Sequence, residues 1–156
     1  MNIESQQAKS IPTATITRTA AVALITAAVA LIEAARAAAT EIGVGVSVAV
    51  TDAAGNLTVF ERTDGSPFLT AEVAINKAWT AASYDLATHV WNTYLTADSK
   101  AAQLAHTPRL VAVGGGYPVR EGGKLIGGIG ISGGTYLQDQ QIAEEALRAL
   151  GLKAPE

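Results

Sequence analysis

The sequence predicts an α+β fold, a three-layer sandwich in which helices flank one five-stranded antiparallel sheet. Three observations predict it. Ala-rich segments carry apolar residues at helical spacing, and short β-branched runs are bounded by Gly- and Asp-containing turns. The expected order is helix, two strands, two helices, three strands, helix, which is typical of helices packed on one antiparallel sheet.

The first helix is expected from near Thr15 to Ile42, where Gly43 and Gly45 end it. Its apolar run, 20–32, has the length of an export-signal core and is too short to span a membrane. The helical spacing continues past this run to Ile42, so an amphipathic helix packed on the sheet explains it better. We expect a flexible arm over 1–13 and a single domain over 14–156, located in the cytoplasm.

A hairpin follows this helix. The run 44–51 is apolar at nearly every position, which predicts a strand in the middle of the sheet. The turn 52–56 leads into a second strand, 57–62, whose polar residues Glu61 and Arg62 indicate a position nearer the edge.

The next two helices carry the chain's clustered aromatic residues. The helix expected over 68–83 is small and apolar on most faces, but Lys77 interrupts it and shares a stripe with Thr80 and Tyr84. A lysine in a helix most often extends its ammonium group to solvent, and a functional role is the alternative. A helix over 89–104, interrupted near 97–98, adds Trp91. The aromatic residues either pack together or wall a pocket, and packing is the favoured interpretation.

The last third of the chain holds most of the glycines, between Gly114 and Gly134. We expect strands over 108–113, 117–120 and 125–132, and a closing helix over 136–150. Thr135 and Gln138 have the spacing of a capping box. Backbone amides near this helix start could bind a carboxylate or phosphate. Equally, the glycines could serve only turns, bulges and close contact between helix and sheet.

Composition argues against several classes of function. The 156 residues include 11 Lys and Arg against 14 Asp and Glu, without a basic cluster, so a nucleic-acid partner is not expected. The absence of cysteine excludes disulfides, thiolate catalysis and Cys-ligated zinc. Two histidines, His89 and His106, are too few for an all-protein metal cage. We expect neither a membrane partner nor a metal site other than heme iron.

Five segments together resemble the GlcG/HbpS-like heme-binding (heme-degrading) family, which also supplies the C-terminal domain of PduO-type proteins. The resemblance covers roughly residues 20–150 and implies a profilin-like sandwich and a homo-oligomer. One branch of the family is similar to 4-hydroxylaminobenzoate lyase, which makes 3,4-dihydroxybenzoate and ammonia. The segments are 52–57, 62–65, 77–81, 114–118 and 127–134, the last followed closely by 138–139.

The family resemblance implies a small-molecule ligand, and heme is the first hypothesis. A flat, carboxylate-bearing ligand needs cationic or amide donors, for which Lys77, Arg109 and the glycine amides are available. Heme also needs an axial ligand, either His89 or His106, or a tyrosine. The residues expected to bind the ligand are Arg62, Thr80, Trp91, Gly115, Gly116, Tyr117, Ser132, Gly133 and Gly134.

The sequence leaves open whether the protein is an enzyme. Heme degradation and the lyase reaction are the two catalytic alternatives, and a lyase needs an acid and a base that converge. The candidate catalytic residues are Glu61, Lys77, Tyr84 and His89. A non-catalytic oligomeric sensor or scaffold module is the third hypothesis.

Overall fold

The computed structural model describes residues 18–155, so the arm expected over 1–13 lies outside the described residues. The elements are, in order, α1 (Arg18–Glu41), β1 (Ser47–Asp52), β2 (Leu57–Arg62), α2 (Leu69–Tyr84), α3 (Thr88–Ala97), the 3-10 helix η1 (Ala101–His106), β3 (Gly116–Glu121), β4 (Lys124–Ser132) and α4 (Tyr136–Ala149). The α+β class and the helices expected from the sequence are confirmed. The break expected near 97–98 separates α3 from η1.

The sheet has four strands in the order β2-β1-β4-β3, and every neighbouring pair is antiparallel. The central position expected for the first strand is confirmed, because β1 pairs with both β2 and β4. The second strand, β2, lies at an edge as expected. Ala49 on β1 thus faces Phe60 on one side and Gly130 on the other.

The expectation of a fifth strand over 108–113 is wrong. Arg109 adopts a left-handed conformation (φ 69°), which a strand does not accommodate. The Thr80 hydroxyl accepts the Val111 N–H at 3.0 Å, and the Asn92 amide donates to the Ala112 carbonyl at 2.9 Å. Side chains of α2 and α3 therefore occupy backbone groups that a strand ladder would have used.

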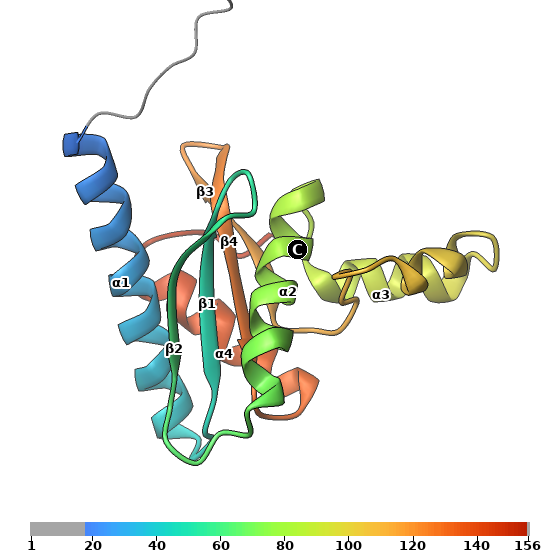
Figure 1. Cartoon of the computed structure of the whole chain (residues 1–156), viewed down its shortest axis with the longest axis horizontal. Helices are drawn as coiled ribbons and strands as arrows, with labels where there is room; N and C mark the ends of the chain where they lie inside the picture. Colours follow the sequence, from blue (N-terminus) through green and yellow to red (C-terminus); the bar gives the residue numbers. More distant parts are fainter. Residues whose placement is uncertain (1–17, 156) are drawn as a thin grey trace, which may run out of the picture.

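The sheet lies between two helical layers (Figure 1). α1 and α4 cover one face and contact each other, while α2 covers the other face. Side chains along β1 and the residue before it point alternately to these two faces. Val46, Val48 and Val50 join the core beneath α1 and α4, whereas Ala49 packs with Ala74 and Ala78 of α2.

Small residues on the α2 side of the sheet let this helix approach the strands closely. A Cβ atom on Gly128 would meet the Ala78 carbonyl, and one on Gly130 would meet the Ala74 carbonyl. Thus α2 rests almost directly on the backbone of β4, which explains part of the glycine-rich run.

By length and composition, α1 could cross a membrane over Val22–Glu41, a longer stretch than the thirteen-residue run seen in the sequence. Residues on one side of α1 are nevertheless buried in the core, as expected for an amphipathic helix packed on the sheet. They are Ala28, Leu31, Ile32, Ala35, Ala38 and Ala39.

The segment from α3 through η1 extends beyond the sheet (Figure 1). We call residues 88–106 the arm from here on; it is distinct from the N-terminal arm expected over 1–13. A small apolar cluster of its own holds the arm together. Trp91, Leu95 and Ala101 are buried there, and Leu86, Leu110 and Ala112 pack against them.

The close approach of α2 to β4 predicts that Gly130→Ala destabilises the protein. The new methyl group would overlap the Ala74 carbonyl and lie 2.6 Å from the Ala78 nitrogen. Overpacking of this kind costs about 1–3 kcal/mol of unfolding free energy, which urea denaturation measures. Gly45→Ala is the matched control, since its nearest neighbours would lie 3.6 Å away. Equal stability of the two variants would contradict the contact.

Candidate functional site

The start of α4 has the capping box expected from the sequence. The Thr135 hydroxyl accepts the Gln138 N–H at 3.3 Å, and the Gln138 side chain accepts the Thr135 N–H at 2.9 Å. The Gly134 N–H donates to Asp139 Oδ1 at 3.0 Å. A carboxylate of the chain itself therefore occupies the helix start, where an external anion was one expectation.

Lys77 reaches from the middle of α2 to the same place. Its ammonium Nζ lies 2.7 Å from Asp139 Oδ2 and donates to the Ile131 carbonyl at 2.8 Å. The side chains of Lys77 and Asp139 are only 2% and 4% exposed. The expectation that the ammonium group extends to solvent is therefore wrong, because a carboxylate and a carbonyl satisfy it inside the protein.

Burial and pairing act in opposite directions on this ion pair. Burial lowers the pKa of Lys77, whereas the nearby Asp139 raises it. Burial likewise raises the pKa of Asp139, opposed by Lys77 and by the Gly134 and Gly133 amides. In each case burial is the larger cause, so each group depends on its partner to stay charged.

The glycine turn 114–116 packs over this ion pair. A Cβ atom on Gly115 would lie 2.7 Å from the Asp139 Cβ and 3.0 Å from Lys77 Nζ, and φ there is +115°. The Thr88 hydroxyl of α3 accepts the Gly116 N–H at 2.9 Å and donates to the Val113 carbonyl at 2.6 Å. Bare backbone is thus required here to join α2, α3 and α4.

A cavity of about 440 Å³ lies where the arm, the glycine turn and α4 meet. His89 is half-buried in its wall, and the imidazole Nδ1 is buried without a hydrogen-bond partner in the described structure. The lining residues are His89, Asn92, Thr93, Val113, Gly114, Tyr136 and Gln140. The cavity therefore combines one nitrogen ligand or base with several neutral hydrogen-bonding groups.

Tyr117 lies beside His89, with ring centroids 5.5 Å apart. Its hydroxyl donates to Glu144 Oε1 of α4 at 2.6 Å. Burial, together with the Glu144 carboxylate, raises the pKa of Tyr117 well above its ordinary value. Tyr117 therefore stays a neutral phenol, and its proton is committed to Glu144.

The other candidate catalytic residues do not line this cavity. Glu61 lies on β2 and its carboxylate approaches Arg36 of α1 at 3.6 Å. Tyr84 is 73% exposed at the end of α2, and His106 is exposed on η1. Of the four residues expected to be catalytic, His89 alone contributes to the cavity wall.

The residues expected to bind a ligand are similarly dispersed. Thr80 is buried and bonded to the 109–111 backbone, Trp91 is in the core of the arm, and Arg62 is exposed at the end of β2. Gly115, Gly116 and Tyr117 do not line the cavity. Ser132 ends β4, and Gly133 and Gly134 lead from it toward α4.

Apart from His89, none of the residues that line the cavity was among those expected to bind the ligand or to be catalytic. They are Asn92, Thr93, Val113, Gly114, Tyr136 and Gln140. The sequence offered one usable signal, because Asn92 and Thr93 lie within a turn of His89 on the same helix. It held no local signal for α4, which is more than forty residues further along the chain.

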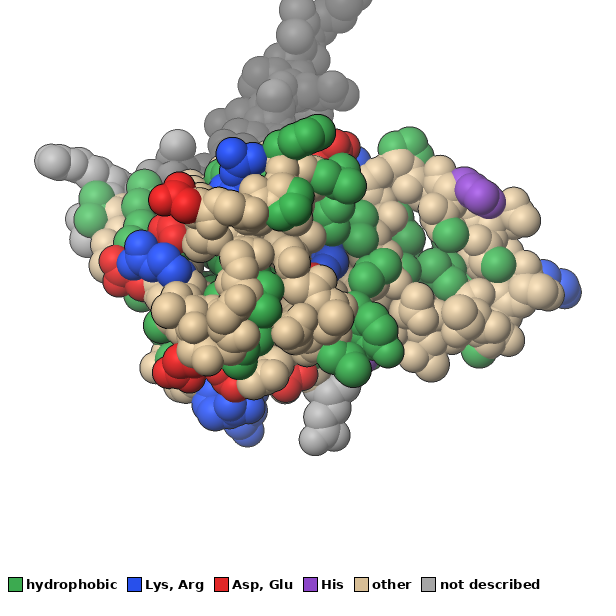
Figure 2. Space-filling model, turned by 90° about the horizontal axis from the view of Figure 1, so that it is seen from below, with side chains coloured by type: hydrophobic (Ala, Val, Ile, Leu, Met, Phe, Trp, Pro, Cys, Tyr) green, Lys and Arg blue, Asp and Glu red, His purple; other side chains and the backbone are tan. Residues whose placement is uncertain are grey.

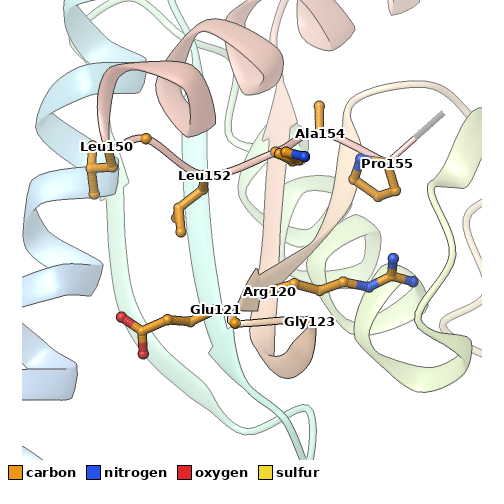
Figure 3. A pocket seen from close by; sticks show the side chains of 10 residues that line it. Arg120, Glu121, Gly123, Leu150, Leu152, Ala154 and Pro155 are labelled. Atoms are coloured by element: carbon orange, nitrogen blue, oxygen red, sulfur yellow. The ribbon is translucent and has the colours of Figure 1, made fainter.

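A larger hollow of about 790 Å³ lies beneath the C-terminal segment 150–155, where it passes over the β3–β4 hairpin (Figure 3). None of the residues that line it was a candidate from the sequence. Arg120 in its wall is bound to Asp85, with Nε 2.6 Å from Oδ1. Its described lining includes Glu121 and Lys153 but no histidine, so it offers no imidazole to an iron centre.

Comparisons with known proteins give a consistent result. The profile of the family described as "Haem degrading protein HbpS-like" matches residues 25–148. An uncharacterised 15.0 kDa protein of Citrobacter freundii is 39% identical over 113 residues, which cover 71% of this chain and 80% of that protein. The corrinoid adenosyltransferase PduO of the same organism is 37% identical over 74% of this chain, but the match spans only 35% of PduO.

Solved structures agree in fold. HbpS has a TM-score of 0.77 with 32% identity, covering 92% of this chain and 95% of its own. PduOC, solved as a complex with heme, has a TM-score of 0.74 with 31% identity, covering 92% of this chain and 100% of its own. Klebsiella pneumoniae ORFY has a TM-score of 0.76 with 34% identity, covering 92% of this chain and 95% of its own.

The buried ion pair predicts a large loss of stability when one partner is removed. Asp139→Asn leaves the Lys77 ammonium without a counter-charge, which costs about 3–5 kcal/mol of unfolding free energy. Adding Lys77→Met to this variant should recover part of the loss. Glu61→Gln, which removes the half-exposed contact with Arg36, is the control and should cost about 1 kcal/mol or less. Denaturant titration measures all three, and a double variant less stable than Asp139→Asn alone would contradict the coupling.

Proposed function

The chain belongs to the HbpS-like family of heme-degrading proteins, and we propose that it binds heme or a similar flat, carboxylate-bearing molecule in the cavity beside His89. The observation that carries the proposal is the half-buried His89 imidazole in the cavity wall. Imidazole is a common protein ligand of heme iron.

The residues present fit such a group. The cavity volume of about 440 Å³ falls within the usual range for small-molecule sites. His89 is preferred over His106, because His106 is exposed on η1 and does not line this cavity. Tyr117 is less suited as an axial ligand, because its hydroxyl proton is committed to Glu144.

Heme, when bound, would supply an iron centre capable of redox chemistry, and the chain would supply position and surroundings. His89 would hold the iron, and Tyr117 would support one face of the imidazole ring. Asn92, Thr93 and Gln140 would donate or accept hydrogen bonds around the ligand.

The known heme complex of PduOC, at 31% identity, supports this proposal. The lyase alternative has less support, because Glu61 and Tyr84 lie apart from the cavity and cannot act with His89 as acid and base. Heme degradation stays an alternative to simple binding. The homo-oligomeric state and the cytoplasmic location stay predictions.

Titration with hemin tests the proposal. We expect a saturable shift of the Soret absorption band, and we expect His89→Ala to weaken binding by roughly tenfold or more because the residue that would hold the iron is lost. His106→Ala is the matched control and should bind like the wild type. Absence of a Soret shift in the wild-type protein, or equal loss in the two variants, would contradict the proposal.

A further inference from the structure

The cavity beside His89 has an uncharged lining. Among the described residues that form its wall, none is Asp, Glu, Lys or Arg. The helix α3, which supplies three of them, carries no such residue anywhere along its ten positions. Figure 2, which views the molecule from below, shows the charged side chains mainly over the body, whereas the arm bears few until its tip.

The start of α4, where an external carboxylate was expected, is already filled. Asp139 accepts the Gly134 N–H at 3.0 Å and faces the Lys77 ammonium at 2.7 Å. These are the donors that a bound acid would need: a backbone amide at a helix start and a cation. Because both groups of the ion pair are sealed from solvent, neither is offered to a ligand.

The other charges near the cavity do not compensate. Glu144, which lies behind Tyr117, is negative and disfavours a second carboxylate. The Arg109 guanidinium lies over the Trp79 ring, 4.7 Å from its centre, and its Nε donates to Asn76 at 3.2 Å. That cation is therefore held on α2 and does not line the cavity.

We propose that the cavity selects its ligand by an uncharged, planar portion and the iron, and that the carboxylates remain in solvent. This inference rests on the proposed heme site but goes beyond it, because it assigns specificity to the ring and not to the propionates. It also reverses the expectation that cationic and amide donors hold the acid groups. A small benzoate-type acid, whose recognition depends on its carboxylate, should bind poorly.

Hemin and hemin dimethyl ester, compared on the full-length protein in the same solvent mixture, test the inference. The ester keeps the ring and the iron but lacks both negative charges. We expect the two dissociation constants to agree within about threefold, and hemin binding to change little with salt, because no desolvated ion pair is made. A preference for hemin of roughly tenfold or more, reduced by salt, would overturn the inference while leaving the heme site itself intact. Failure of both compounds to bind would overturn the heme proposal and this inference together.

A charge introduced at the cavity provides a second measurement. Thr93 lines the cavity and Thr96 does not, yet both are exposed on α3 and each donates to the carbonyl four residues earlier. Thr93→Lys should make hemin bind about three- to fivefold more tightly than its ester, as expected for an exposed ion pair. Thr96→Lys adds the same charge and should show no preference. A preference of roughly tenfold or more in Thr93→Lys would mean that a carboxylate lies desolvated inside the cavity, and would overturn the inference.

Discussion

The ion pair between Lys77 and Asp139 joins α2, α4 and β4 beneath the glycine turn. Lys77 belongs to α2 on one face of the sheet and Asp139 to α4 on the other. The ammonium group also donates to the carbonyl of Ile131, near the end of β4. Burial penalises both charges, so the contact is stable only when the helices are correctly placed. The glycine turn can cross directly above the pair because Gly115 has no side chain.

Small residues likewise form the contact between α2 and the sheet. Gly128 and Gly130 bring the backbone of β4 against α2, and Ala74 and Ala78 complete the contact from the helix. Close approach of α2 is what allows Lys77 to cross to α4 with both hydrogen bonds near ideal length. The glycine-rich sequence therefore serves packing first, and Gly114 alone of the turn 114–116 lines the cavity.

Features with local causes could be predicted from the sequence. The capping box at Thr135, the hairpin turn after Asp52 and the edge position of β2 follow from residues within a few positions of each other. The segment 108–113, which was expected to be a strand, has a suitable apolar sequence. Its backbone, however, is hydrogen-bonded by Thr80 and Asn92 from elsewhere in the chain. Such competition is tertiary, and a single strand pattern does not reveal it.

The site shows the same division. His89 was a candidate because its side chain has recognisable chemistry, and the structure gives it a cavity. The partner of Lys77 lies 62 residues away, and nothing in the spacing identified Asp139 as that partner. A lysine in an otherwise apolar helix does indicate that some buried acceptor is required, but which acceptor meets it depends on how the helices pack.

The two helical walls of the cavity, α3 of the arm and α4 of the main body, differ in how firmly they are packed. The α4 wall belongs to the main core, where Ile142 and Ala143 are fully buried, whereas the α3 wall depends on the separate cluster around Trp91. Regions with few buried contacts open at lower free-energy cost than the core. On heating, the α3 wall should therefore open before the sheet unfolds, and the protein would lose its ability to bind the ligand while the sheet is still native. A melting curve that follows only the sheet does not report the temperature at which the site is lost.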